Sequence, residues 1–231
     1  MSSIHFPRGV FPRGVLFDLD GTLLDSAPDM IAAINLMRDA RGEAPMSLAA
    51  LRPHVSKGAR AMIRASWGHL DDAEREAMVK PFLDIYEQEL GKHCVLFDGI
   101  AEMLDALEAD GARWGIVTNK PFYLAEKLMP MLGWSDRCGV LIGGDSLAER
   151  KPHPLPLLHS AEVIGIAPED CVYVGDDERD IVAARAAAMP SVVALWGYRL
   201  PEDDPVAWNG DRMIENPKTL LDARAWPRTR T

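Results

Sequence analysis

The chain contains an apolar run that ends in two acidic residues, Val15-Leu16-Phe17-Asp18-Leu19-Asp20-Gly21-Thr22. A short continuous apolar run is typical of a strand buried on both faces of a parallel sheet. Because strand side chains alternate, Asp18 and Asp20 leave the strand end on the same side. Two carboxylates this close repel each other unless a cation or a proton holds them together. The stretch indicates either a cation-binding strand end or a surface turn, where Asp-Gly pairs are also common.

Similar short apolar runs recur later in the chain, separated by stretches with helical spacing of apolar residues. One such helical stretch ends at Gly111 and another at Gly133, and glycine is the expected stop signal just past a helix. Alternating strands and helices predict an α/β fold with a doubly wound, Rossmann-like parallel sheet and ligands at the carboxyl ends of its strands. The further predicted strands are Trp114–Val117, Val140–Ile142, Val172–Val174 and Ser191–Leu195.

The alternation stops after the first strand, because the pattern from Ala27 to about His93 is helical throughout. Pro81 lies inside this region and is expected either to kink a helix or to start a new one. We therefore predict an inserted α-helical cap domain at residues 27–95 and a catalytic core formed by residues 11–26 and 96–231. Residues 1–10 form an N-terminal extension, since the sequence of residues 6–10 is repeated at once in residues 11–15.

Polar side chains follow three more of the predicted strands. Thr118-Asn119 follows the second strand, Lys151 precedes Pro152, and Gly175-Asp176-Asp177-Glu178-Arg179-Asp180 follows Val172–Val174. Each motif alone also fits an ordinary role: a helix cap, a solvated surface lysine or an acidic helix N-terminus. Neighbouring strands lie only ~4.8 Å apart, so these strand ends can converge. Together they would bring a nucleophile, a second acid, a hydroxyl, an ammonium group and metal-binding carboxylates to one site.

The four motifs resemble those of the haloacid dehalogenase-like superfamily and occur in that family's order, from about residue 15 to 200. The helical insertion resembles the cap of the phosphoglycolate phosphatase group. The segments Ser56–Met62, Trp114–Pro121 and Val174–Ile181 are also very similar to bacterial N-acetylmuramic acid 6-phosphate phosphatases. The chain departs from the usual pattern at Ala188, where the family has glycine, and at Asp98, where it often has proline.

The resemblance implies a covalent mechanism that uses Mg²⁺ as cofactor. Asp18 would attack phosphorus and form an aspartyl-phosphate. Asp20 would protonate the leaving oxygen and later deprotonate the attacking water. The metal would lie between Asp18, the carbonyl of Asp20 and Asp176, and would offset the repulsion between nucleophile and phosphate. Asp177 and Asp180 would either be auxiliary metal ligands or contact the residues that bind the metal.

The resemblance also implies how the phosphate is held and where specificity arises. Thr118, the amide of Asn119 and Lys151 would bind the phosphoryl oxygens and stabilise their charge in the transition state. Substrate specificity is expected from the cap, whose segment from Arg52 to Arg64 is basic in an otherwise acidic chain. A solvated helix face is the alternative explanation for that segment. The candidate specificity residues are His54, Lys57 and Arg60.

The amino-acid composition limits the classes of partner that the protein is expected to bind. The formal net charge of -10 argues against a general nucleic-acid binder, because neutralising phosphates requires clustered lysine and arginine. Three scattered cysteines suggest neither a disulfide framework nor a zinc site, so we expect a reducing, cytoplasmic location. No apolar stretch approaches the roughly 20 residues needed to cross a bilayer, so no membrane association is expected. The expected partner is a small-molecule phosphate ester, bound by a monomer or a homodimer.

Other activities share parts of this pattern. A phosphomutase would use every one of these catalytic residues and differ in returning the phosphate to its substrate. A haloacid dehalogenase would need neither Asp20 nor the metal residues. A receiver-like signalling module also combines acids, a threonine and a lysine, but the second carboxylate and the cap favour hydrolysis. A non-catalytic phosphate-binding protein is disfavoured because no motif position is lost. The phosphate ester itself, phosphoglycolate or N-acetylmuramic acid 6-phosphate, is not decided by these motifs.

Overall fold

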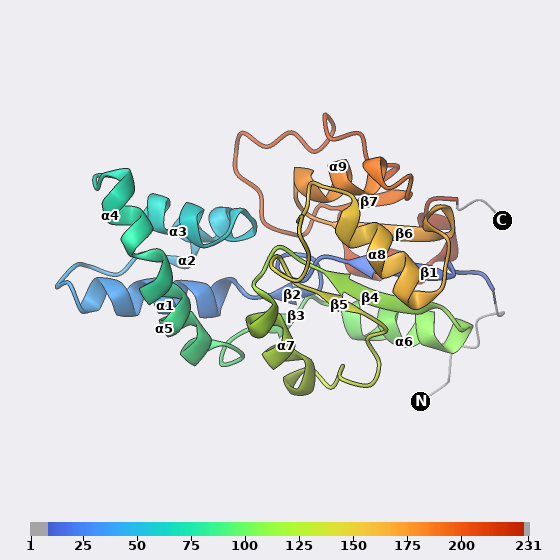
Figure 1. Cartoon of the computed structure of the whole chain (residues 1–231), viewed down its shortest axis with the longest axis horizontal. Helices are drawn as coiled ribbons and strands as arrows, with labels where there is room; N and C mark the ends of the chain where they lie inside the picture. The colour runs from blue at the N-terminus through green and yellow to red at the C-terminus, as the bar shows by residue number, and fades with distance from the viewer. Residues whose placement is uncertain (1–8, 229–231) are drawn as a thin grey trace.

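A six-stranded parallel sheet forms the centre of the core in the computed structural model, which describes residues 9–228 (Figure 1). The strands lie in the order β5-β4-β1-β6-β7-β8. Their bounds are β1 Gly14–Phe17, β4 Arg113–Val117, β5 Leu141–Ile142, β6 Cys171–Gly175, β7 Ser191–Ala194 and β8 Arg212–Ile214. The predicted doubly wound sheet is confirmed, with each of the five predicted strands within one residue of its expected bounds. The edge strand β8 was not predicted.

Helices cover both faces of this sheet, as the alternation of its side chains requires. Val15 and Phe17 of β1 belong to the apolar cluster beneath α6 and α7, whereas Leu16 between them belongs to the cluster beneath α8 and α9. The bounds are α6 Ile100–Asp110, α7 Phe122–Met131, α8 Leu155–Ile164 and α9 Glu178–Ala186. Three short 3-10 helices complete the described core: η2 Pro168–Asp170, η3 Pro217–Leu221 and η4 Ala223–Ala225.

The position of β1 at the centre of the sheet explains why the motifs meet. Phe17 pairs with Ile116 of β4 on one side and with Val174 of β6 on the other. The chain first builds outward from β1 through β4 to β5, and then returns to the other side of β1 with β6. The carboxyl end of β1 is therefore the topological switch point, where open α/β sheets bind their ligands.

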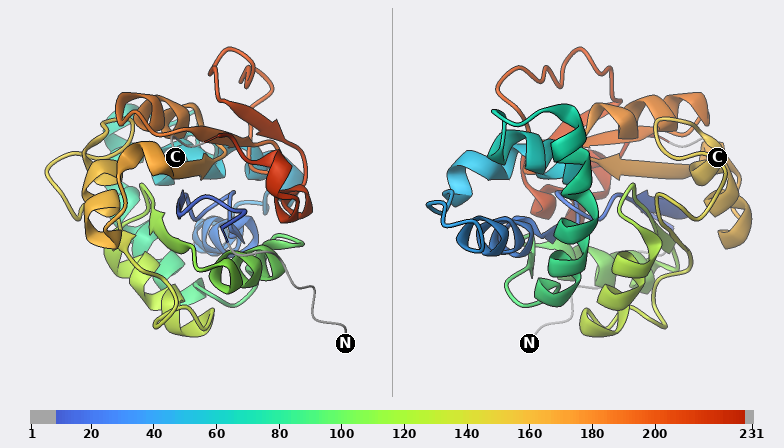
Figure 2. Two further views of the ribbon diagram at one scale, coloured as in Figure 1. Left: turned by 90° about the vertical axis from the view of Figure 1, so that its right-hand side faces the viewer. Right: turned by 60° about the vertical axis from the view of Figure 1, so that its left-hand side comes forward.

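Five α-helices and one 3-10 helix form the inserted cap, which lies beside the sheet at the left of Figure 1 and comes forward in the right panel of Figure 2. The long helices α1 and α5 pack against each other through buried side chains such as Ile34 and Phe82. Pro81 lies in the first turn of α5, so it starts a helix and does not kink one. The bounds are α1 Ala27–Asp39, α2 Leu48–Leu51, η1 Arg52–Lys57, α3 Ala59–Ser66, α4 Asp72–Ala77 and α5 Val79–Glu89.

The cap connects to the core through two short antiparallel strands, β2 Leu24–Asp25 and β3 Val95–Leu96. The two side-chain oxygens of Asp25 both accept hydrogen bonds from Arg52 at 2.9 Å. One of them also accepts a bond from the Tyr198 hydroxyl at 2.7 Å. Arg52 belongs to the cap and Tyr198 to the core, so Asp25 joins the two at their connection. Within residues 9–228, no helix has the length and apolar character of a membrane span.

Candidate active site

The sharp turn after β1 places the motif that begins at Asp18 against the motif that contains Asp176. The backbone N–H of Asp18 donates to the carbonyl of Val174 at 2.9 Å, which continues the pairing of β1 with β6. The chain then reverses at Gly21, where φ is +85°. A Cβ atom at this position would lie 2.2 Å from an oxygen of Asp176. Glycine is therefore required both by the left-handed backbone and by the close approach of the carboxylate.

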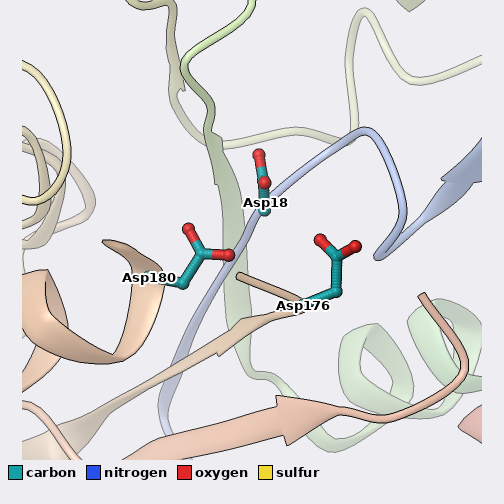
Figure 3. Close-up of side chains that lie close together, drawn as sticks. All are labelled: Asp18, Asp176 and Asp180. Atoms are coloured by element: carbon teal, nitrogen blue, oxygen red, sulfur yellow. The ribbon is translucent and has the colours of Figure 1, made fainter. Parts of the chain in front are cut away.

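Three carboxylates from different elements gather at this switch point (Figure 3). Asp18 follows β1, Asp176 follows β6 and Asp180 lies in the first turn of α9. One carboxylate oxygen from each lies within 4.8 Å of the others. Burial raises the pKa of Asp176 and of Asp180, and the negative charge of Asp18 adds to this effect. The donor set therefore favours a bound cation or a retained proton.

Asp176 has no cationic partner among residues 9–228, although it is completely buried. It accepts hydrogen bonds from the hydroxyl of Thr22 at 3.3 Å, the hydroxyl of Ser56 at 2.7 Å and the backbone N–H of Tyr198 at 2.8 Å. Such neutral donors do not compensate a buried charge. Because carboxylate oxygens are the ligands preferred by hard divalent cations, the cluster fits a divalent metal ion.

Lys151 supplies the buried positive charge beside this cluster. Its ammonium group lies 3.1 Å from Asp18, 2.7 Å from Asp180 and 2.7 Å from the hydroxyl of Tyr173. Burial alone would lower the pKa of Lys151, but the carboxylates of Asp18 and Asp180 raise it above its usual value. The side-chain amide of Asn119 donates to the carbonyl of Lys151 at 2.9 Å and so ties the end of β4 to the turn before α8.

Thr118 directly follows β4, the strand that pairs with β1. Its backbone N–H donates to Ile142, and its hydroxyl accepts a hydrogen bond from the N–H of Lys120 at 3.2 Å. The side chain is buried against the core but still lines the pocket described below. A hydroxyl in this position can donate to a phosphoryl oxygen that lies against Asp18 and Lys151.

Asp177 lies outside the carboxylate cluster and pairs with two cations. It begins α9 through a capping box with Asp180, and its oxygens lie 2.9 Å from Lys57 and 2.7 Å from Arg179. Burial tends to raise the pKa of Asp177, yet Arg179 and Lys57 lower it to about 2. Asp177 is thus a charged link between the core and the cap, whereas Asp180 lies beside Asp18 and Asp176.

A pocket of about 250 Å³ lies between the cap and the strand ends. Asp18, Asp20 and Lys151 lie on its core side. Of the predicted specificity residues, Lys57 and Arg60 line the pocket, whereas His54 does not. Lys57 contacts Asp177 and Asp203, and Arg60 pairs with Glu76. The apolar side chains of the wall are Met30, Val55, Val79, Phe82, Leu83 and Leu124.

Several pocket residues were not predicted as site residues from the sequence. Ser56 donates to Asp176 from the cap, and Arg179 donates to the backbone carbonyl of Ser56. Lys120 lies 3.2 Å from both oxygens of Asp20 and contacts Tyr86 of α5. Lys120 directly follows Thr118-Asn119, and Arg179 is a cation within an acidic run. The sequence pattern therefore offered a reason to consider both as site residues. Ser56 begins one of the segments that resemble N-acetylmuramic acid 6-phosphate phosphatases, but its contact with Asp176, like the role of Tyr86, depends on how the cap is placed.

With this geometry in place, comparison with known proteins defines the class. Residues 15–194 match the family described as haloacid dehalogenase-like hydrolase. This span includes all four motifs and the predicted strands, apart from Leu195 at the end of the last one. The chain belongs to this family, and its curated relatives identify it as a phosphatase.

The similar proteins cover nearly the whole chain. A phosphoglycolate phosphatase from Xanthomonas campestris pv. campestris (strain 8004) is 63% identical over 94% of this chain and 98% of its own length. An N-acetylmuramic acid 6-phosphate phosphatase from Pseudomonas aeruginosa is 43% identical over 91% of this chain and 93% of its own. The crystal structure of a predicted phosphoglycolate phosphatase from Haemophilus somnus superposes with a TM-score of 0.80 at 27% identity, covering 92% and 97% of the two chains.

Proposed function

We propose that this protein is a Mg²⁺-dependent phosphomonoester hydrolase that acts through an aspartyl-phosphate on a small carboxylate-bearing phosphate ester, as a phosphoglycolate phosphatase does. The observation that carries the proposal is the position of Asp18, whose carboxylate lies 3.1 Å from the buried ammonium of Lys151 at the base of a covered pocket. A carboxylate held against a fixed cation is oriented both to attack phosphorus and to have a phosphoryl group bound beside it.

Asp18 acts as the nucleophile. Its carboxylate attacks phosphorus, the bond to the leaving oxygen breaks, and the phosphoryl group is transferred to Asp18. Lys151 and the hydroxyl of Thr118 line the same pocket as Asp18 and would bind the phosphoryl oxygens and stabilise the charge that spreads over them. Because Asn119 fixes the backbone of Lys151, it positions the ammonium group. Water then attacks the aspartyl-phosphate and releases phosphate.

Asp20 acts as the general acid and base. It lines the same pocket two residues beyond the nucleophile. In the first step it gives its proton to the leaving oxygen, and in the second it takes a proton from the attacking water. One carboxyl group can perform both tasks, because the second step reverses the roles of the first.

Mg²⁺ would be held by Asp18, Asp176 and the backbone carbonyl of Asp20, with Asp180 beside it. Bound there, it would supply positive charge between the nucleophile and the anionic substrate. The buried and uncompensated carboxylate of Asp176 supports this assignment. Asp177 keeps its two cationic partners and holds the adjacent loop.

Arg150 supports a substrate that carries a carboxylate. It lines the pocket directly before Lys151, and it is the pocket-lining cation for which residues 9–228 offer no carboxylate within ion-pair distance. An arginine fork that is free of acidic partners matches a carboxylate in two parallel hydrogen bonds. Lys57, in contrast, already contacts the carboxylates of Asp177 and Asp203.

The apolar wall of the pocket favours N-acetylmuramic acid 6-phosphate as the second candidate substrate. Met30, Val79, Phe82 and Leu83 of the cap present apolar surface to the pocket. A two-carbon acid has no group to place against them. The N-acetyl and lactyl methyl groups of the amino sugar could cover part of this surface, and burying them would be favourable.

Initial rates of phosphate release test the proposal. Both candidate esters are assayed with Mg²⁺ and with a chelator, at equal protein concentration. We expect Mg²⁺-dependent release of free phosphate from at least one of them. Hydrolysis of neither ester would overturn the carboxylate-bearing substrate class, and transfer of phosphate between sugars without its release would indicate a mutase.

A further inference from the structure

Lys120 is a nearly buried cation whose ammonium group faces the proposed general acid. It lies just after Thr118-Asn119 at the end of β4, and only 7% of its surface is exposed. Its Nζ atom lies 3.2 Å from both carboxylate oxygens of Asp20. An aspartate side chain can otherwise rotate about two bonds, so a cation that contacts both oxygens restricts the carboxyl group to one orientation.

Tyr86 connects the same ammonium group to the cap. Its hydroxyl oxygen accepts a hydrogen bond from Lys120, and the centre of its ring lies 4.4 Å from Nζ. Tyr86 belongs to α5, is buried, and stacks on Phe82 with ring centres 5.9 Å apart. Tyr86 can therefore leave Lys120 only when α5 itself moves.

The position of Lys120 suggests more than a structural ion pair. Burying a lysine carries a large desolvation penalty, which a single partly exposed carboxylate offsets only in part. Here the remaining contacts come from a residue of the other domain. The contacts of the ammonium group are therefore complete only when the cap is closed on the core.

We propose that Lys120 positions Asp20 for proton transfer to the leaving oxygen, and that Tyr86 makes this positioning dependent on cap closure. The proposal rests on the proposed role of Asp20 as the general acid. It gives the cap a part in the chemistry beyond covering the substrate, since an open cap removes Tyr86 from the group that orients the acid. Lys120 and Tyr86 are positioning residues, because each acts through Asp20.

Leaving-group dependence separates this role from a structural one. Benzyl phosphate and p-nitrophenyl phosphate have similar aromatic bodies, but only the benzyl alkoxide needs protonation in order to leave. We measure kcat/KM, which reports the steps up to the departure of that group. For Tyr86→Phe we expect a loss about tenfold larger with benzyl phosphate, and for Lys120→Met about a hundredfold larger, within the range of general acid catalysis. Lys120→Arg is expected to restore part of the difference.

Further variants define the outcome. Tyr86→Phe removes only a hydroxyl, so it remains informative if Lys120→Met does not fold. Tyr123→Phe, on α7 and outside the pocket lining, is the matched control. It is expected to leave unchanged the ratio of the kcat/KM values for the two esters. In the double variant of Lys120 and Tyr86, the ratio is expected to equal that of Lys120→Met alone. Additive effects would overturn the action of Tyr86 through Lys120.

Asp20→Asn distinguishes failure of this inference from failure of the proposed function. If Asp20→Asn changes the ratio while Lys120→Met and Tyr86→Phe lower both esters equally or not at all, the positioning role is wrong and the mechanism stands. If Asp20→Asn itself leaves the ratio unchanged, Asp20 is not the general acid, and both proposals fail.

Discussion

The hydroxyl of Ser56 in the cap donates a hydrogen bond of 2.7 Å to Asp176, the fully buried carboxylate of the core. This bond crosses the boundary between the two parts of the protein and ends on a proposed metal ligand. Two neighbouring contacts also cross this boundary. Lys57 forms an ion pair with Asp177, and Arg179 donates a hydrogen bond to the carbonyl of Ser56. The carboxyl end of η1 is therefore attached to the segment after β6 by side chains of both.

Removing this hydroxyl is expected to weaken the closed state. A hydrogen bond to a charged group contributes about 1.5–3 kcal/mol, so Ser56→Ala should lower kcat/KM about ten- to a hundredfold for any ester that needs the closed cap. Ser47→Ala is the matched control, because the side chain of Ser47 caps α2 within the cap by accepting a hydrogen bond from the N–H of Ala50. Steady-state kinetics of both variants decide the matter, and an equal loss for Ser47→Ala would contradict a role at the boundary.

The nucleophile gives a second prediction. Asp18→Asn is expected to abolish phosphatase turnover and leave the fold intact, because the amide has nearly the same shape and is a poor nucleophile. The measurement is phosphate release together with a thermal melt of the variant. Turnover within about tenfold of the unmodified protein would rule out the covalent mechanism.

Arg150 gives a prediction about specificity. Arg150→Gln is expected to lower kcat/KM for phosphoglycolate about ten- to a hundredfold and to spare p-nitrophenyl phosphate, since only the first substrate has a carboxylate for the guanidinium group to bind. Lys57→Met serves as the comparison. Because Lys57 contacts Asp177 and Asp203, its loss should affect both esters to the same extent. A selective loss in Lys57→Met alone would assign the carboxylate to the cap.

Much of the fold could be predicted because buried parallel strands are continuous apolar runs. β1, β4 and β6 are such runs, and their positions were found within one residue. The edge strand β8 was not predicted because two of its three residues, Arg212 and Met213, are exposed and so form no continuous apolar run. The strands β2 and β3 have two residues each, too few for any periodicity.

The part of the site that lies at strand ends could also be anticipated, since topology alone brings such ends together. The contacts across the boundary could not. Tyr86 and Lys120 are 34 residues apart and meet because the cap brings Tyr86 of α5 to the residues that follow β4. Lys57 lines the pocket, and its contact with Asp203, far along the chain, has no counterpart in any local sequence pattern.

Ala188 offers a prediction about stability. It follows α9 with φ at 55°, a left-handed conformation that strains every residue with a Cβ atom. Ala188→Gly is expected to raise the free energy of unfolding by about 1 kcal/mol, which corresponds to roughly 2–4 °C in melting temperature. Ala186, exposed at the last position of α9, provides the control. Ala186→Gly should lower the free energy of unfolding by about 0.5–1 kcal/mol, and stabilisation by both changes would contradict the strain argument.

The raised pKa of Asp176 predicts how Mg²⁺ stabilisation depends on pH. In the metal-free protein the folded state retains this proton to a higher pH than the unfolded chain, whose aspartates titrate near ~3.9. This contribution to stability is complete below that pKa and is lost as pH rises through the raised folded value. A cation that binds the ionised carboxylate restores the loss, so Mg²⁺ should stabilise the protein more at neutral than at acidic pH.

At about 100 times its dissociation constant, a bound ligand raises the free energy of unfolding by about 2.7 kcal/mol, or the melting temperature by roughly 5–10 °C. Thermal melts at neutral and acidic pH, with Mg²⁺ and with a chelator, measure the difference, and Asp176→Asn should reduce its pH dependence, leaving the part due to Asp180. The same Mg²⁺ effect at every pH, or an unchanged Mg²⁺ effect in Asp176→Asn, would contradict the assignment of Asp176 as a metal ligand.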